Sequence, residues 1–148
     1  MREKVIFHVD VNSAFLSWSA IRALSEGAKE DYRKIPCVVG GDESRRHGVV
    51  LAKSLPAKKY GIRTGESLFE ARRKCPEVLV IPPDFPWYVE RSRAMMEILK
   101  KYSPDVIQYS IDEAFLDMTG MEGLMGRPVE AACRLKDQIR DELGFTVN

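Results

Sequence analysis

The order of strand and helix signals along the chain constrains its fold more than any other feature of the sequence. The run "KVIFHVDV" at residues 4–11 is rich in β-branched and aromatic side chains and predicts a strand. Apolar residues at helical spacing predict a helix over 84–102. Two strands follow, one near 105–111 and one that ends at Met118, with a turn at Asp112 and Glu113 between them. A last helix begins at Pro128, and the closing "FTVN" predicts the start of a further strand.

Without residues 16–78, these signals read strand, helix, strand, strand, helix and an unfinished strand. That is the split βαβ order of a ferredoxin-like sheet. The sequence therefore predicts an α+β fold in which a ferredoxin-like antiparallel sheet lacks its last strand and carries an inserted small α/β lobe. The expected boundaries are residues 1–15 and 79–148 for the ferredoxin-like part and 16–78 for the insertion.

Short elements are predicted around and within the insertion. A helix over 13–27 has Ser13 at its N-cap position, and a short helix over 67–75 is capped by Ser67. Another short helix is expected at 56–60. The strand signals are "IPCVVGG", "HGVVLAKS" and "EVLVIPP".

Charge is unevenly distributed along the chain. Residues 44–74 carry nine Lys and Arg residues and two Glu residues, a net charge of +7, whereas the formal net charge of the whole chain is only +1. A basic segment beside an acidic remainder indicates one region that meets polyanions and another that binds metal. A solvated basic helix face is the plain alternative.

Composition excludes several other classes of protein. No segment approaches the roughly 18 consecutive apolar residues of a membrane span, so a cytoplasmic location is expected. The cysteines at 37, 75 and 133 form no CxxC pair, which indicates buried, reduced thiols. His8 and His47 are too isolated for a zinc site, and a structural role is expected for each.

Three acidic residues form the candidate site. The stretch "YSIDEAFLD" at 109–117 places Asp112 and Glu113 inside an apolar, strand-like run, although moving a carboxylate out of water costs several kcal/mol. A ferredoxin-like sheet lays its first strand beside this hairpin, so Asp10 is expected to join the pair. Three carboxylates suit Mg²⁺ and predict two-metal phosphoryl transfer. The alternatives are a strand-end turn for Asp10 and an exposed hairpin tip for the pair.

Longer stretches of the chain resemble the Y-family translesion DNA polymerases, in particular their DNA polymerase IV and UmuC-like branch. The resemblance lies in "HVDVNSAF", "GGDESRRHGVVLAKSLPAKKYGIRTGESLFEARRKCP", "YSIDEAFLDMT" and "ELGFTVN", and covers essentially the whole chain. It implies that residues 1–15 and 79–148 form a palm and residues 16–78 form the fingers.

The same resemblance implies roles for individual residues. Asp10 and Asp112 match the two metal-bridging aspartates, Glu113 the adjoining metal-site acid, and Val11 a backbone carbonyl ligand, for two Mg²⁺ ions with Mn²⁺ as an alternative. Phe15 matches the steric gate, a ring beneath the incoming sugar that leaves no room for a ribose 2′-OH; an ordinary core aromatic is the alternative. Nucleotide contacts are implied at Ser13, Ala14, Phe15, Lys53, Leu55, Lys58 and Ser110, and DNA contacts at Arg45 and Arg46.

One motif departs from the family. Where relatives have Tyr-x-x-Arg to grip the triphosphate, this chain reads Leu55-Pro56-Ala57-Lys58, which loses a hydroxyl donor and the planar guanidinium fork. Lys53 or Lys59 could compensate. Arg45 and Arg46 could equally be surface charge.

The expected function is template-directed transfer of dNTPs onto a primer 3′-OH opposite damaged template, with primer-template DNA as partner. Relatives continue into a final palm strand, a thumb and a little finger, so the chain reads as an N-terminal catalytic fragment with little activity alone. A sliding-clamp contact would need that missing part, and the open sheet edge could pair with another copy. The alternatives are a non-catalytic polymerase-like repair scaffold and, because "GGDES" at 40–44 echoes the GGDEF signature, a nucleotide cyclase.

Overall fold

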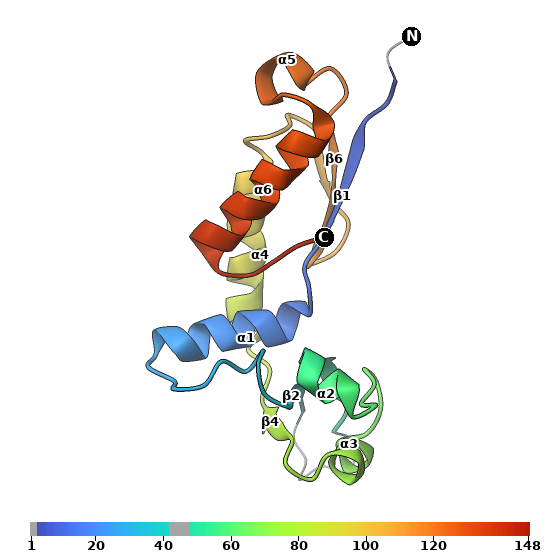
Figure 1. The fold of residues 1–148 in the computed structure, drawn as a ribbon, viewed down its shortest axis with the longest axis vertical. Coiled ribbons are helices and arrows are strands. Elements are labelled where there is room, and N and C mark those ends of the chain that lie inside the picture. Colours follow the sequence, from blue (N-terminus) through green and yellow to red (C-terminus); the bar gives the residue numbers. More distant parts are fainter. Residues whose placement is uncertain (1–2, 42–47) are drawn as a thin grey trace. The chain divides into compact units, whose positions relative to one another are not determined.

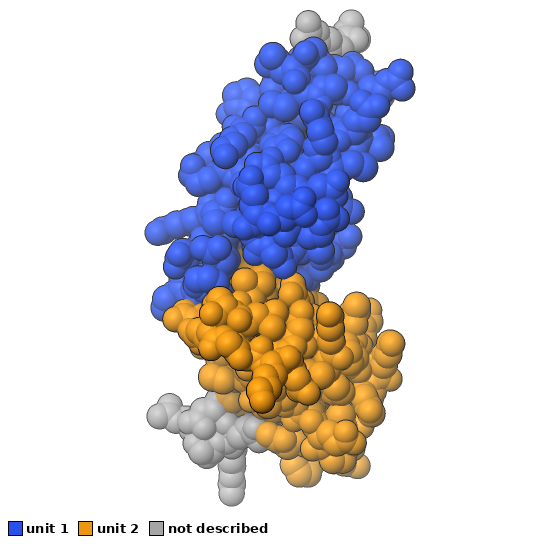
Figure 2. All heavy atoms as spheres, turned by 60° about the vertical axis from the view of Figure 1, so that its left-hand side comes forward, with its two compact units in different colours: residues 1–12, 86–148 blue, residues 13–85 orange. Residues whose placement is uncertain are grey.

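A computed structural model describes residues 3–41 and 48–148, which divide into two compact units (Figure 1, Figure 2). The first unit contains the chain up to Asn12 together with Pro86–Asn148, and the second contains Ser13–Phe85. Among the described residues, no helix is long and apolar enough to cross a membrane.

The first unit is built on a three-stranded antiparallel sheet in the order β1-β6-β5. Its strands are β1 (Ile6–Asp10), β5 (Val106–Gln108) and β6 (Glu113–Asp117). Side chains alternate between the two faces, as a pleated strand requires. Val9, Ala114 and Leu116 are buried, whereas His8 is exposed and Phe115, its partner on β6, is half-buried.

Two long helices lie on one side of this sheet (Figure 1). They are α4 (Phe85–Leu99) and α6 (Pro128–Leu143), and a short helix, α5 (Glu122–Met125), precedes α6. The four apolar positions that predict the first long helix are all buried in the structure: Tyr88, Met95, Leu99 and Tyr102. Burial of this face, rather than helix propensity, is what stabilises such a helix.

The chain closes by starting a fourth strand beside β1. Val147 forms an antiparallel bridge with Val11. Asp10 and Asn148 exchange two backbone hydrogen bonds, with N···O distances of 3.0 and 2.8 Å. The order of these elements confirms the ferredoxin-like topology.

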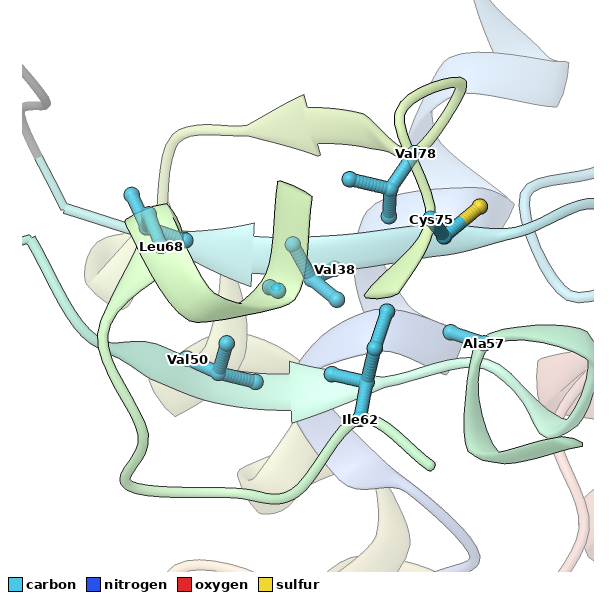
Figure 3. Close-up of a cluster of buried hydrophobic side chains, with 8 residues drawn as sticks. Val38, Val50, Ala57, Ile62, Leu68, Cys75 and Val78 are labelled. Carbon is cyan, nitrogen blue, oxygen red and sulfur yellow. The ribbon is translucent and has the colours of Figure 1, made fainter. Parts of the chain in front are cut away.

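The second unit has its own small sheet, in the order β3-β2-β4, in which β2 and β4 are parallel. Its core holds the buried side chains drawn in Figure 3, which come from the strands, from both short helices and from the segments between them. Ser67 caps α3 by accepting a hydrogen bond from the Glu70 amide, as predicted. The elements are α1 (Ala14–Ser25), β2 (Cys37–Gly40), β3 (Val50–Lys53), α2 (Leu55–Lys59), α3 (Leu68–Lys74) and β4 (Leu79–Ile81).

The second compact unit extends beyond the predicted insertion, which ended at residue 78. Strand β4 pairs with β2, and this pairing holds the chain in the second unit up to Phe85. At the other end the unit begins at Ser13 rather than at residue 16, because α1 belongs to it as a whole.

Three local predictions differ from the structure. Cys37 and Cys75 are buried as expected, but Cys133 is exposed, because α6 buries Ala131, Leu135 and Ile139 and turns residue 133 to solvent. Ser13 precedes α1 in the left-handed region, with φ 44°, and its side chain makes no capping hydrogen bond. Glu113, expected in a turn, is the first residue of β6.

Candidate active site

The three predicted acids meet at one end of the sheet in the first unit. Asp10 is the last residue of β1 and lies directly opposite Glu113, the first residue of β6, in the antiparallel register. Directly paired residues project their side chains on the same face of a sheet. Asp112 comes just before β6, and its carbonyl accepts a hydrogen bond from the Val11 amide at 3.0 Å. The backbone therefore brings residues 10–11 against residues 112–113.

The side chains of the acid pair converge on a serine hydroxyl. Ser110 Oγ lies 2.8 Å from Asp112 Oδ1 and 3.1 Å from Glu113 Oε2. A hydroxyl carries one hydrogen, so it can donate fully to only one of the two carboxylates at a time. Ser110 thus links the two acids without neutralising either of them.

His8, for which its isolation in the sequence predicts only a structural role, is also a member of the site. Its Nε2 lies 3.1 Å from Glu113 Oε1, and its ring stacks on Phe115 with centroids 4.5 Å apart. The alternation of side chains along a strand could have predicted this, because residues 8 and 10 of one strand lie on the same face of the sheet. His8 therefore stands on the same face as Asp10 and reaches diagonally to Glu113.

The electrostatics of the site are centred on Asp10. Partial burial raises the pKa of the Asp10 carboxyl, the negative charges of Asp112 and Glu113 raise it further, and His8 acts in the opposite direction. Burial and like charges both disfavour the ionised form. The folded chain therefore holds a repulsion among three carboxylates that a bound cation would relieve.

These groups fit a divalent cation by their chemistry. Carboxylate and carbonyl oxygens are the ligands that Mg²⁺ and Mn²⁺ prefer. Within residues 3–41 and 48–148, however, no three His, Cys, Asp or Glu side chains are gathered closely enough to hold an ion as they stand. Asp112 and Glu113 are turned toward Ser110 and His8 instead.

The remaining predicted residues belong to the second unit. Phe15 is half-buried on α1, with its ring centroid 5.8 Å from that of Phe85 in an edge-on contact and 6.3 Å from that of Trp18. Ser13 and Ala14 lie at the N-terminal end of α1, where an α-helix leaves its first amides without intrahelical partners.

The first and last residues of the altered clamp motif, Leu55 and Lys58, face solvent. Leu55 is the first residue of α2 and is 68% exposed, and Lys58 is exposed one helical turn later. Lys53 Nζ donates a hydrogen bond to Thr64 Oγ1 at 3.1 Å. Arg45 and Arg46 lie outside the described residues.

Gly40, where "GGDES" begins, ends β2 in the second unit. A cyclase would require this motif on the hairpin that carries Asp112. The described part of the motif therefore lies on the wrong sheet for cyclase chemistry.

Comparison with known proteins gives a consistent family assignment. Residues 9–148 match the IMS family, described as the impB/mucB/samB family. The chain is 59% identical to DNA polymerase IV of Clostridium acetobutylicum, over 98% of the chain and 36% of that protein. It is 40% identical to DNA polymerase IV of Alkaliphilus oremlandii, over 95% of the chain and 34% of that protein. The chain thus spans about a third of the length of these relatives.

Solved structures share the fold. The crystal structure of DinB from Sulfolobus solfataricus matches with a TM-score of 0.84 at 27% identity, over 96% of this chain and 40% of that one. The insertion ternary complex of Dbh DNA polymerase matches with a TM-score of 0.83 at 25% identity, over the same shares of the two chains.

Proposed function

Since the chain belongs to the impB/mucB/samB family, which includes Y-family DNA polymerases, we propose that it forms the palm and fingers of a translesion DNA-directed DNA polymerase. The palm corresponds to the unit that carries Asp10, Asp112 and Glu113, and the fingers to the unit that carries the basic segment. The substrates are dNTPs and primer-template DNA. The observation that carries this proposal is the direct pairing of Asp10 with Glu113 beside Asp112.

In this proposal the acids hold the reaction centre. Asp10, Asp112 and Glu113, together with the Val11 backbone carbonyl, would hold two divalent cations. When bound, such ions lower the pKa of the attacking hydroxyl and stabilise the charge on the transferring phosphate. The carboxylates supply the fixed negative charge that gathers these cations beside a polyanionic substrate, and the raised pKa of Asp10 supports that assignment.

Phe15 and the start of α1 would receive the nucleotide. The ring of Phe15 packs edge-on against Phe85 and at a tilt against Trp18, so these two rings define where it lies. The N-terminal end of a helix attracts phosphate through its amides and its dipole. We assign Ser13 and Ala14 to the triphosphate and Phe15 to discrimination against the ribose 2′-OH.

Lys53, Lys58 and Ser110 complete the proposed nucleotide contacts. Lys58 offers a point charge where relatives offer a guanidinium fork, and Leu55 offers no donor. The clamp on the triphosphate is therefore expected to be weaker in this chain than in relatives that keep both groups.

A chimera tests the proposal. Residues 1–148 replace the matching segment of the Clostridium relative, which is 59% identical, and primer extension is measured with Mg²⁺. We expect extension by the chimera and none by its Asp112→Ala variant, while both bind primer-template DNA. Extension that survives Asp112→Ala would overturn the metal assignment, and a folded, DNA-binding chimera that never extends would favour the scaffold alternative.

A further inference from the structure

One buried serine on α4 forms a hydrogen bond with the backbone just before the acid pair Asp112 and Glu113. Ser92 is only 2% exposed, and its Oγ donates a hydrogen bond to the carbonyl oxygen of Ile111 at 2.5 Å. Ile111 immediately precedes Asp112. A helix in the core of the first unit thus reaches the peptide next to the acid pair through a single hydroxyl.

A second side chain holds the same stretch from β5. Gln108 Nε2 donates to the carbonyl oxygen of Ser110 at 3.2 Å and lies 3.4 Å from Ser92 Oγ. The carbonyls of Ser110 and Ile111 are therefore bonded by Gln108 and Ser92, and these two side chains lie within hydrogen-bond distance of each other. Residues 109–112 form no regular strand, so these side-chain bonds add to the few backbone bonds that fix them.

We propose that Ser92, assisted by Gln108, is a positioning residue that sets where the carboxylates of Asp112 and Glu113 lie. The inference rests on the proposed function, since it assigns these carboxylates to metal binding. Groups that hold metal ligands in place commonly change metal affinity about 10–100-fold when they are removed. Ser92 itself would touch neither metal nor nucleotide.

The chain offers a matched control at the opposite end of the same hairpin. Ser103 is also 2% exposed, and its Oγ donates to the carbonyl oxygen of Asp117, at the end of β6, at 2.6 Å. Ser92→Ala and Ser103→Ala each remove one buried hydroxyl that bonds a backbone carbonyl of this hairpin. A purely structural role predicts similar consequences for both variants.

The experiment compares four proteins: the unchanged chain, Ser92→Ala, Ser103→Ala and Asp112→Ala. Mn²⁺ affinity is titrated by electron paramagnetic resonance, and amide resonances of residues 105–118 are recorded by NMR without metal. We expect Ser92→Ala to weaken Mn²⁺ binding by at least about tenfold and to shift the amides of residues 109–113. Ser103→Ala should shift the amides near Asp105 and Asp117 and keep Mn²⁺ affinity within about twofold, because distant sites act independently.

Further variants guard against a failure to fold. Ser92→Thr restores the hydroxyl and should recover most of the lost affinity. Gln108→Met removes the donor at an exposed position, so it should fold and should weaken Mn²⁺ binding in the same direction as Ser92→Ala. The positioning role is overturned if Ser92→Ala matches Ser103→Ala in affinity and leaves the amides of residues 109–113 in place.

The two proposals fail separately in this design. If the unchanged chain and Asp112→Ala bind Mn²⁺ equally, the metal assignment is wrong. The positioning role is then judged from the NMR data alone. It stands if Ser92→Ala shifts the amides of residues 109–113 and Ser103→Ala does not, and it falls if Ser92→Ala leaves them in place.

Discussion

Asp10 and Glu113, far apart in the sequence, are direct partners across β1 and β6. With Asp112 they form a cluster of like charge in which burial and both neighbours raise the pKa of Asp10. The folded chain therefore holds this cluster at some expense of stability, as is common at functional sites.

Asp10→Asn should stabilise the metal-free chain and abolish its response to Mn²⁺. A carboxyl whose folded-state pKa lies above its unfolded value binds its proton more tightly when folded, so stability falls as pH rises from the unfolded pKa through the raised one. Asparagine at residue 10 carries no charge, so at neutral pH the variant does not lose the stability that ionised Asp10 costs the unchanged chain. Ligand at 100 times its Kd adds about 2.7 kcal/mol to the unchanged chain and none to the variant. Thermal unfolding at pH 7 with and without Mn²⁺ measures both effects, and equal Mn²⁺ stabilisation of the two proteins would contradict the assignment.

Asp31→Asn should lower stability at neutral pH. Both carboxylate oxygens of Asp31 accept from the Arg33 guanidinium, at 2.9 to 3.2 Å, and these bonds lower the pKa of Asp31. The contribution is present above the unfolded pKa and is lost as pH falls through the lowered folded one. We expect a loss of about 1–2 kcal/mol at pH 7, shrinking toward pH 3 in urea unfolding. Asp137→Asn, which breaks an exposed pair with Arg140, is the control and should cost less than about 0.5 kcal/mol.

The folded chain should present one reactive thiol. Cys133 is exposed on α6, whereas Cys75 is buried and burial raises the pKa of Cys37 to about 12. The thiolate is the reactive form, so a buried thiol with a raised pKa is inert. Mass spectrometry after iodoacetamide treatment at pH 8 should show one adduct on the folded chain, none on Cys133→Ser, and three adducts on the unfolded chain. A second adduct on the folded chain would show that one of the two core cysteines is accessible.

The exposure of Cys133 follows from the helical period, and the general tendency of cysteines to be buried was the wrong guide. Residue 133 lies two positions before Leu135, about 200° around the helix, so it is on the far side from Leu135 whichever of Ala131 and Ala132 begins the apolar stripe. The structure buries Ala131. Packing decides between the two alanines, because both have equal helix propensity.

The meeting of the acids was predictable, whereas the contacts that hold them were not. Strand order follows from the sequence of elements, and strand order places Asp10 beside Glu113. Ser92 is the one serine of α4 and lies four residues after Tyr88 and three before Met95, on the face that the helical period buries. Which backbone carbonyl its hydroxyl meets depends on how the helix packs against residues 109–112, and no short-range signal in the sequence carries that.

Phe15→Ala in the chimera should admit ribonucleotides. The ring packs against Phe85 and Trp18, so its removal opens space beneath the proposed sugar position. We expect the ratio of kcat/KM for dNTP to that for the matching NTP to fall at least about tenfold. Phe69→Ala is the control, because Phe69 is a 71% exposed phenyl group on α3 of the same unit. Sugar discrimination that is unchanged in Phe15→Ala would mean that the ring only packs.

The altered clamp can be tested by restoring it. Leu55 and Lys58 stand three residues apart on α2, which places them on the same helix face, and both are exposed, so Leu55→Tyr with Lys58→Arg should fold without strain. A hydrogen bond to a charged group contributes about 1.5–3 kcal/mol, which corresponds to roughly a tenfold or larger fall in KM for dNTP. A contact made equally in the ground state and the transition state lowers KM and leaves kcat unchanged.

Lys34→Arg is the control for added guanidinium charge at an exposed position of the same unit, and its KM should stay near that of the unchanged chimera. An unchanged KM in the double variant would mean that another group already holds the triphosphate. Lys53 is the next candidate, because its amine lies within the same unit and donates to the neutral hydroxyl of Thr64 rather than to a carboxylate. Lys53→Ala would then be expected to raise KM where the double variant had no effect.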